Sequence, residues 1–231
     1  MTRRHYGRSS VSNEPLRWPP SASPALLHPA SRAYVKERGL LDDEVESNGL
    51  HYVETGEWTN RLLIPIFEGE ALVAFQGRSL DGTEPRYRTA GPRPIYVPWG
   101  PIEYAETVLD RVLCLVEGPF DAFATARVCL SAATLGNMPS PRQIKEILAL
   151  CSDGRIDQIV VWYDAEAVKE AFDLQLKLRP YIETVVHLDP TVKDPGGLLP
   201  CNPDCIGTML ARTRSGNNAL IRSNESIGTR P

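Results

Sequence analysis

The sequence predicts an α/β protein in which a doubly wound, mainly parallel sheet follows a smaller, mixed α+β basic subdomain. Apolar runs at 111–116, 158–164 and 183–188 alternate with helical patterns, as is typical of a parallel sheet covered on both faces. Residues 50–78 instead show apolar segments joined by tight turns, which favours strands of a separate sheet. Arginines gather near the beginning of the chain, although the net charge of the 231 residues is -4. A local basic strip of this kind can bind nucleic acid even in an acidic protein.

Composition divides the chain into four parts. Residues 1–28 are rich in Arg, Pro and Ser and are expected to form a flexible arm. Residues 29–104 are expected to form the basic subdomain, and residues 105–212 the parallel-sheet domain. Residues 213–231 are expected to form a flexible tail.

Individual elements follow from local signals. Pro29 is suited to begin a short helix, and Gly39 is suited to cap its end. Ser140 is a plausible N-cap before Pro141 in a helix with one apolar face. The other predictions are strands at 51–54, 61–67, 71–78 and 131–136, and helices at 119–127, 165–178 and 206–212.

Acidic residues follow three of the predicted parallel strands. Glu117 follows the first, Asp164 and Glu166 follow the second, and Asp194 lies beyond the third. Because the carboxyl ends of parallel strands lie at one edge of the sheet, these carboxylates are expected to lie close together and to repel unless a cation neutralises them. Hard oxygen ligands suit Mg²⁺ or Mn²⁺, which also bridge substrate phosphates.

A structural reading of the first acidic segment, "VEGPFDA", competes with this one. Pro119 suits the first position of a helix, and acids in a first turn suit the positive end of the helix dipole. Asp121 is explained about equally well by this reading and by a role beside the metal. Helix capping does not explain why Asp164 and Asp194 also follow strands.

These motifs resemble the TOPRIM domain, the catalytic module shared by DnaG-type primases, topoisomerases and some nucleases. "VEGPFDA" matches its first motif at Glu117, Gly118 and Asp121, while "WYDAEA" and "KDPGG" resemble its second and third. The resemblance implies metal ligation by Glu117, Asp164, Glu166 and Asp194, with the first three catalytic. Gly118 and Asp121 would support these ligands, and Lys193 is a candidate phosphate contact.

The preceding segment narrows the resemblance to DnaG-type primases. "LIPIFEGEALVAFQGRSL", "EPRYRTAG" and "SRAYVKERGL" are similar to segments of the basic subdomain in that family. The resemblance implies a groove for nucleic acid or nucleotide lined by Arg78, Arg86 and Tyr87. Arg88 is a further candidate contact to nucleic acid or nucleotide. Guanidinium groups hold phosphates, and a tyrosine ring can stack on a base.

The implied function is synthesis of short RNA primers on single-stranded DNA during replication, by two-metal nucleotidyl transfer with Mg²⁺ or Mn²⁺. The partners would be a single-stranded DNA template, ribonucleoside triphosphates, and a separate replicative helicase or zinc-ribbon protein. The sequence shows no four-cysteine ribbon, no phosphate loop of a fused helicase and no membrane span, and zinc is not expected. The expected location is the cytoplasm, or the host cytoplasm for a phage protein.

Two departures from the family pattern keep alternatives open. Glu166 is one methylene longer than the expected Asp, and Gly196 stands where a second Asp is expected. A metal-dependent TOPRIM nuclease would use the same carboxylates. A non-catalytic nucleic-acid-binding replication accessory protein would keep the fold without the metal geometry.

Overall fold

The structure is a computed structural model that describes residues 16–99, 109–189, 191–200 and 203–225, with side chains as far as residue 214. The first part of the chain contains β1 (Ala22–Pro24), η1 (Ala25–Leu27), α1 (Pro29–Glu37), α2 (Asp42–Ser47), β2 (His51–Val53), β3 (Arg61–Glu68), β4 (Ala71–Ser79) and β5 (Tyr87–Ala90). The second part contains β6 (Leu109–Val116), α3 (Pro119–Ala126), β7 (Cys129–Ala133), α4 (Pro141–Leu150), β8 (Gln158–Val161), α5 (Val168–Leu178), β9 (Glu183–Val186), η3 (Pro195–Leu198) and α6 (Pro203–Glu225).

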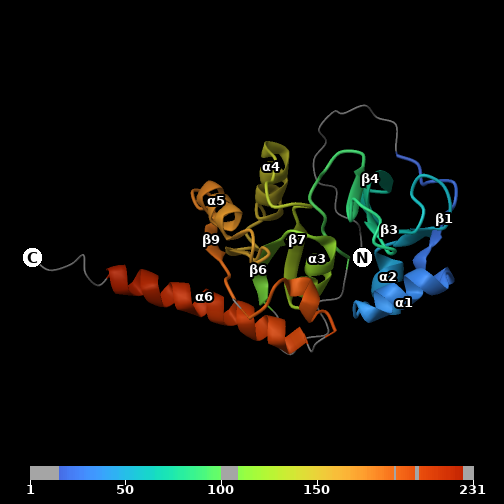
Figure 1. The fold of residues 1–231 in the computed structure, drawn as a ribbon. Coiled ribbons are helices and arrows are strands. Elements are labelled where there is room, and N and C mark those ends of the chain that lie inside the picture. The colour runs from blue at the N-terminus through green and yellow to red at the C-terminus, as the bar shows by residue number, and fades with distance from the viewer. Residues whose placement is uncertain (1–15, 100–108, 190, 201–202, 226–231) are drawn as a thin grey trace, which may run out of the picture.

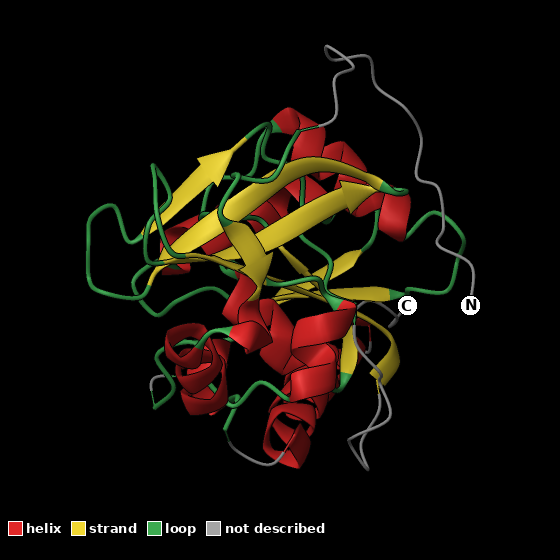
Figure 2. Ribbon diagram, turned by 90° about the vertical axis from the view of Figure 1, so that its right-hand side faces the viewer, coloured by secondary structure: helices red, strands yellow, loops and turns green. Residues whose placement is uncertain are grey.

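The N-terminal sheet is antiparallel, with the strand order β1-β2-β3-β4-β5. The predicted helix α1 and the three predicted strands β2, β3 and β4 are confirmed, whereas α2, β1 and β5 were not anticipated. The helices α1 and α2 lie on one side of this sheet (Figures 1 and 2). Their Val35 and Val45 join the core that includes Leu62 and Ile64 of β3. A separate apolar cluster around Trp58 belongs to the other face.

The prediction of a flexible arm is wrong for residues 16–28. The backbone N–H of Leu16 donates to the carbonyl of Leu72 at 2.9 Å, and β1 pairs with β2. The Trp18 ring stacks on His51, with 4.0 Å between ring centroids. The arm folds onto the sheet because Leu16 and Trp18 offer apolar surface and because the edge strand offers unpaired backbone groups. Residues 1–15 lie outside the described residues.

The second sheet is parallel throughout, with the order β7-β6-β8-β9, which confirms the predicted parallel α/β arrangement. One face packs against α3 and α6 through Phe123 and Leu210, and the other packs against α4 and α5 through Ile147 and Leu174 (Figure 1). The predicted N-cap is also confirmed, since Ser140 Oγ accepts the Gln143 N–H at 3.3 Å.

The last helix runs beyond its predicted end at residue 212. It continues to Glu225, so residues 213–225 are helical where the sequence predicts a flexible tail. The structure anchors the first residues beyond the predicted end. Thr213 shares a hydrogen bond with His187 at 2.5 Å, and Arg214 forms an ion pair with Asp157 at 3.5 Å. These tertiary contacts offset the poor helix propensity of the Gly and Asn residues that follow.

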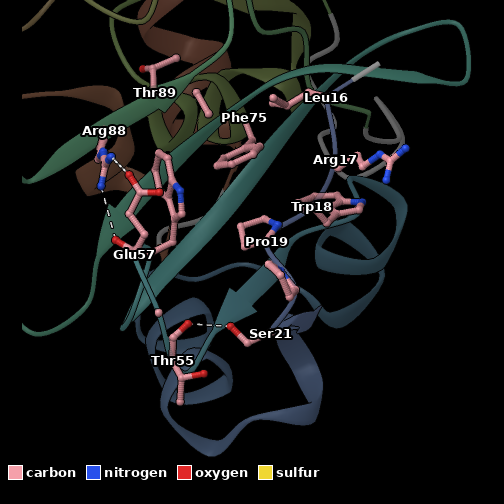
Figure 3. Close-up of a pocket in the computed structure, with 14 residues that line it drawn as sticks. Leu16, Arg17, Trp18, Pro19, Ser21, Thr55, Glu57, Phe75, Arg88 and Thr89 are labelled. Atoms are coloured by element: carbon pink, nitrogen blue, oxygen red, sulfur yellow. Dashed lines mark hydrogen bonds and ion pairs between the residues drawn. The ribbon is translucent and has the colours of Figure 1, made fainter. Parts of the chain in front are cut away.

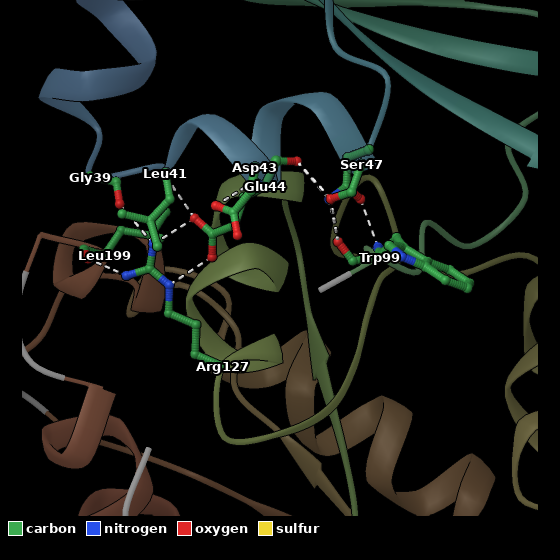
Figure 4. Close-up of polar contacts among 9 residues, drawn as sticks. Gly39, Leu41, Asp43, Glu44, Ser47, Trp99, Arg127 and Leu199 are labelled. Carbon is green, nitrogen blue, oxygen red and sulfur yellow. Dashed lines mark hydrogen bonds and ion pairs between the residues drawn. The ribbon is translucent and has the colours of Figure 1, made fainter. Parts of the chain in front are cut away.

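A buried ion pair joins the two parts of the chain (Figure 4). Arg127, which follows α3, donates to both carboxylate oxygens of Glu44 in α2 at 2.9 and 2.7 Å. The same guanidinium donates to the carbonyls of Leu199 and Gly39 at 2.8 and 2.7 Å. The side chains of Arg127 and Glu44 are only 8% and 4% exposed. The predicted boundary between residues 104 and 105 lies outside the described residues, but the halves it separates share this contact and one apolar core.

No helix in the described part of the chain is both long and apolar enough to cross a membrane.

Candidate active site at the carboxyl edge of the parallel sheet

Glu117 and Asp164 lie beside each other where two neighbouring parallel strands end. β6 and β8 pair in register up to Leu115 and Val161, so the two strands end at the same edge of the sheet. The Asp164 backbone N–H then donates to Oε1 of Glu117 at 3.0 Å. Both side chains are half-buried. The structure therefore places these two predicted site residues together.

The carboxylates at this edge also affect one another's ionisation. Burial, followed by the negative charge of Asp164, raises the pKa of Glu117 to about 7. Burial and the charge of Asp194 raise the pKa of Asp164, while Lys193 and Arg86 act in the opposite direction. Glu166 adds a smaller repulsion to both carboxyls. A group of acids that raise each other's pKa values is chemically suited to bind a cation or to transfer a proton.

Asp121 holds the loop that carries Asp194. Its Oδ2 accepts the Gly118 N–H at 2.9 Å, and its Oδ1 accepts the Gly196 N–H at 2.9 Å. The side chain is 8% exposed, and burial followed by the charges of Asp194 and Asp164 raises its pKa to about 7. Asp121 therefore caps α3, as the structural reading expects, and also ties the turn after Glu117 to the loop after β9.

Gly196 is required where the family pattern expects a second Asp. A Cβ at this position would lie 2.6 Å from Oδ1 of Asp121 and 3.2 Å from Nη2 of Arg38. A distance of 2.6 Å is far inside van der Waals contact, and Asp121 is fixed by its two hydrogen bonds. The residue that departs from the pattern is thus the one that allows the two loops to approach.

Gly196→Ala is expected to destabilise the protein by about 1–3 kcal/mol, because the added methyl must displace Asp121 or the loop. Gly197→Ala is the matched control, since its Cβ would meet only Oδ1 of Asp194 at 3.5 Å. Urea unfolding of the two variants measures the difference. Equal stability of both variants would show that position 196 has room for a side chain. Close packing would then not explain why this position has a glycine in place of a metal-ligating Asp.

The donor set fits a hard divalent cation in its chemistry, since Glu117, Asp164, Glu166 and Asp194 supply only carboxylate oxygens. The arrangement is looser than a finished metal site. Asp194 caps η3 by accepting the Gly197 N–H at 2.7 Å, and Glu166 is exposed. Within the described ranges, no three His, Cys, Asp or Glu side chains are grouped so as to hold a metal ion. The two-metal geometry therefore stays a prediction.

Basic and aromatic side chains face this edge from the N-terminal subdomain. The Arg78 guanidinium carbon lies 4.8 Å from the centre of the Tyr87 ring. The negative charge of Asp121 contributes to the raised pKa of Tyr87. Arg86 is close enough to lower the pKa of Asp164. Tyr87, Arg86 and Lys193 thus lie near enough to the carboxylates to interact with them electrostatically, and Arg78 packs on the Tyr87 ring.

Arg38 and Tyr34 were not predicted as site residues. Arg38 lies over the Phe120 ring at 4.9 Å, and Tyr34 packs edge-on against the same ring at 5.8 Å. The Nε atoms of Arg38 and Arg78 and the hydroxyl of Tyr34 are buried without a hydrogen-bond partner. Such groups are suited to receive an anionic ligand. The sequence signal was the four-residue spacing of Tyr34 and Arg38 at the end of one helix, which places both on one face.

Arg88 lies on the opposite face of the sheet from this group. Side chains alternate along a strand, so the neighbours Tyr87 and Arg88 in β5 point to different sides. The Arg88 guanidinium lies over the Trp58 ring at 4.4 Å and pairs with Glu57. Arg88 therefore lies apart from Arg78 and Tyr87, and a contact between Arg88 and nucleic acid stays a prediction.

Glu117→Gln is expected to remove a pH-dependent loss of stability. Between pH 4.5 and about 7 the folded protein keeps a proton on Glu117 that the unfolded chain has released, so stability falls as the pH rises through this window. The variant lacks this titration. In metal-free buffer, the free energy of unfolding of the wild type should fall by about 1 kcal/mol more than that of the variant when the pH is raised from 5 to 8. Solvent screening of the half-buried group limits this difference.

Urea unfolding with a chelator at both pH values measures this change. Glu37→Gln, in an exposed position of α1, is the control and should keep the pH dependence of the wild type. Parallel pH profiles for the wild type and Glu117→Gln would contradict the raised pKa.

No protein-family model and no curated protein matches this chain, so the assignment of a function rests on the arrangement of its residues.

Proposed function

We propose that the protein is the catalytic core of a DNA primase of the DnaG type, which joins ribonucleotides on a single-stranded DNA template. The observation that carries the proposal is the pairing of Glu117 with Asp164 at an edge that Arg86 also faces. Acids that gather at the end of parallel strands suit phosphoryl chemistry, and guanidinium groups beside them suit phosphate binding. The motif resemblance supports the same reading.

The reaction is the attack of a 3′-hydroxyl on the α-phosphorus of a ribonucleoside triphosphate. A new P–O bond forms at the hydroxyl oxygen, the bond to the β-phosphate oxygen breaks, and pyrophosphate leaves. Bound Mg²⁺ or Mn²⁺, held by Glu117, Asp164, Glu166 and Asp194, would neutralise the carboxylates and stabilise the charge on the phosphate oxygens.

The chain's own groups divide the remaining tasks. Oε1 of Glu117 accepts the Asp164 N–H, which fixes the carboxylate and leaves Oε2 to bind a cation or to take the hydroxyl proton. A pKa of about 7 suits the second role. Arg38 and Arg78 offer buried, unpaired N–H groups for phosphate oxygens. The Tyr87 ring, already stacked on Arg78, offers a surface for a base.

A non-catalytic accessory protein is the second candidate, and the capping role of Asp194 favours it. The cap occupies Oδ1 of Asp194, so this carboxylate has one oxygen fewer to offer a cation. This candidate predicts binding of single-stranded DNA that does not change when divalent ions are removed.

The test incubates the protein with single-stranded DNA, labelled ribonucleotides and Mg²⁺ or Mn²⁺, and separates the products on a gel. Short labelled RNA chains that disappear with a chelator are the expected result. Shortened DNA without RNA would show a nuclease instead. DNA binding with neither product would support the accessory protein and overturn the catalytic proposal.

A further inference from the structure

A groove of about 660 Å³ lies on the face of the N-terminal sheet opposite α1 and α2 (Figure 3). Its walls are the segment 16–21, the turn 55–58 and the edge strand β5, with Phe75 of β4 between them. This face carries the apolar cluster around Trp58 and Phe75 rather than the core shared with the parallel sheet. The groove is therefore separate from the carboxylates of the candidate active site.

Flat side chains hold fixed positions in this groove. Trp18 stacks on His51 at 4.0 Å and lies nearly parallel to Phe75, at 6.0 Å between centroids and 16° between planes. Trp58 packs onto Gly77, where a Cβ would lie 2.9 Å from its ring. The Arg88 guanidinium covers Trp58 at 4.4 Å. Rings and guanidinium planes fixed in this way are surfaces on which unpaired bases stack.

The charge of the groove favours an anionic ligand. Among the residues that line it, Glu57 is the acidic one, and it is paired with Arg88. Arg17 adds an exposed cation at the rim. Aromatic walls with an exposed arginine at their edge match a single strand of nucleic acid better than a neutral or basic peptide.

The position of β5 connects the groove to the candidate active site. β5 is the edge strand of its sheet, and its register with β4 pairs Arg78 with Tyr87 and Gly77 with Arg88. The first pair faces the carboxylates, and the second faces the groove. A single strand that passes around this edge would contact both faces.

We propose that the groove is a second binding site for the same single-stranded nucleic acid, which holds unpaired nucleotides on Trp18 and the Arg88–Trp58 pair. This inference rests on the proposed function. The groove would increase the number of nucleotides that contact the protein beyond those at the active site.

The test measures the affinity of labelled oligothymidylates of about 6 and about 20 nucleotides by fluorescence anisotropy. The wild type should bind the longer strand more tightly. Arg17→Glu, at an exposed position, and Trp18→Leu, which keeps apolar bulk, should each weaken the longer strand about tenfold and leave the shorter strand unchanged. Arg179→Glu, an equal charge change at the end of α5, should bind like the wild type.

Two further measurements show whether the groove itself is occupied. The longer strand should quench tryptophan fluorescence in the wild type and do so less in Trp18→Leu. Thermal unfolding of Arg17→Glu should match the wild type, so that its binding defect is not a folding defect. Equal affinities of the variants and the wild type for the longer strand would overturn the inference. The inference would also be overturned if free nucleotide or a proline-rich peptide displaced the labelled strand at a lower concentration than unlabelled oligothymidylate does.

The two proposals fail separately. Primer synthesis with unchanged binding in Arg17→Glu would reject the groove and keep the primase. Length-dependent binding that requires Arg17, without RNA product, would keep the groove and reject the primase.

Discussion

Asp164→Asn is expected to lower primer synthesis by at least about 100-fold, the size of effect seen when one preorganised charge-stabilising group is removed. The substitution removes a negative charge but retains the shape of the side chain. The backbone N–H of residue 164 still donates to Glu117, so the turn after β8 should stay in place. The loss would therefore report on the charge, which the proposed chemistry needs for a divalent cation.

Stability separates this expectation from a folding defect. The pKa of Asp164 is raised by burial and by Asp194, so its charge is unfavourable in the metal-free protein. The variant should therefore unfold at the same or a higher temperature than the wild type in chelator. Asp173→Asn, at an exposed position of α5, serves as the control with full activity. Full activity of Asp164→Asn would exclude this carboxylate from the reaction, and a lower unfolding temperature would assign it a structural role.

The positions of Glu117 and Asp164 could be predicted because they depend on a short-range signal. Continuous apolar runs identify β6 and β8, and the first acid after each run lies at the edge of the sheet in any parallel arrangement. Neither prediction requires knowledge of a distant contact. The structure places the two residues together for this reason.

Asp194 and Gly196 show where such reasoning fails. Their loop is held by Asp121, a residue 75 positions away from Gly196 in the chain. No local pattern reports that contact, so the packing reason for a glycine at position 196 could not be predicted. Family motifs indicate which residue types recur, and they do not show which of them support the backbone.

The positions of Arg88 and Trp18 could not be predicted, for a different reason. The segment around β5 is rich in Gly and Pro and shows no alternation, so a strand could not be recognised and Arg88 could not be assigned to a face. Trp18 lies in a segment whose composition is typical of disorder, yet one ring stacked on His51 and one edge strand fix it to the sheet. Composition averages over residues, whereas two apolar side chains are enough to dock a segment.

Glu44→Ala is expected to destabilise the folded protein by about 3–5 kcal/mol, the cost of leaving a buried charge without its partner. Arg127 is 8% exposed, and its remaining hydrogen bonds go to the neutral carbonyls of Gly39 and Leu199. The substitution also removes the acceptor of the Leu41 N–H at the start of α2, which lies 2.8 Å from Oε2 of Glu44. The free energy of unfolding in urea measures the total effect.

A double-mutant cycle separates the ion pair from the helix cap. Arg127→Met leaves Glu44 charged, and Glu44 still caps α2 but has no ion-pair partner. The double variant Glu44→Ala with Arg127→Met removes both charges together. If the pair itself accounts for the cost, the double variant should be less destabilised than the sum of the two single variants, by more than about 1 kcal/mol. Additive losses would assign the effect to the cap and to packing.

Because Glu44 belongs to the N-terminal subdomain and Arg127 follows α3, a large coupling would also show that the two parts of the chain unfold as one unit. The arginines that face the carboxylates would then be held in place by a contact remote from the chemistry, and Glu44→Ala should lower substrate affinity under conditions in which the protein is still folded.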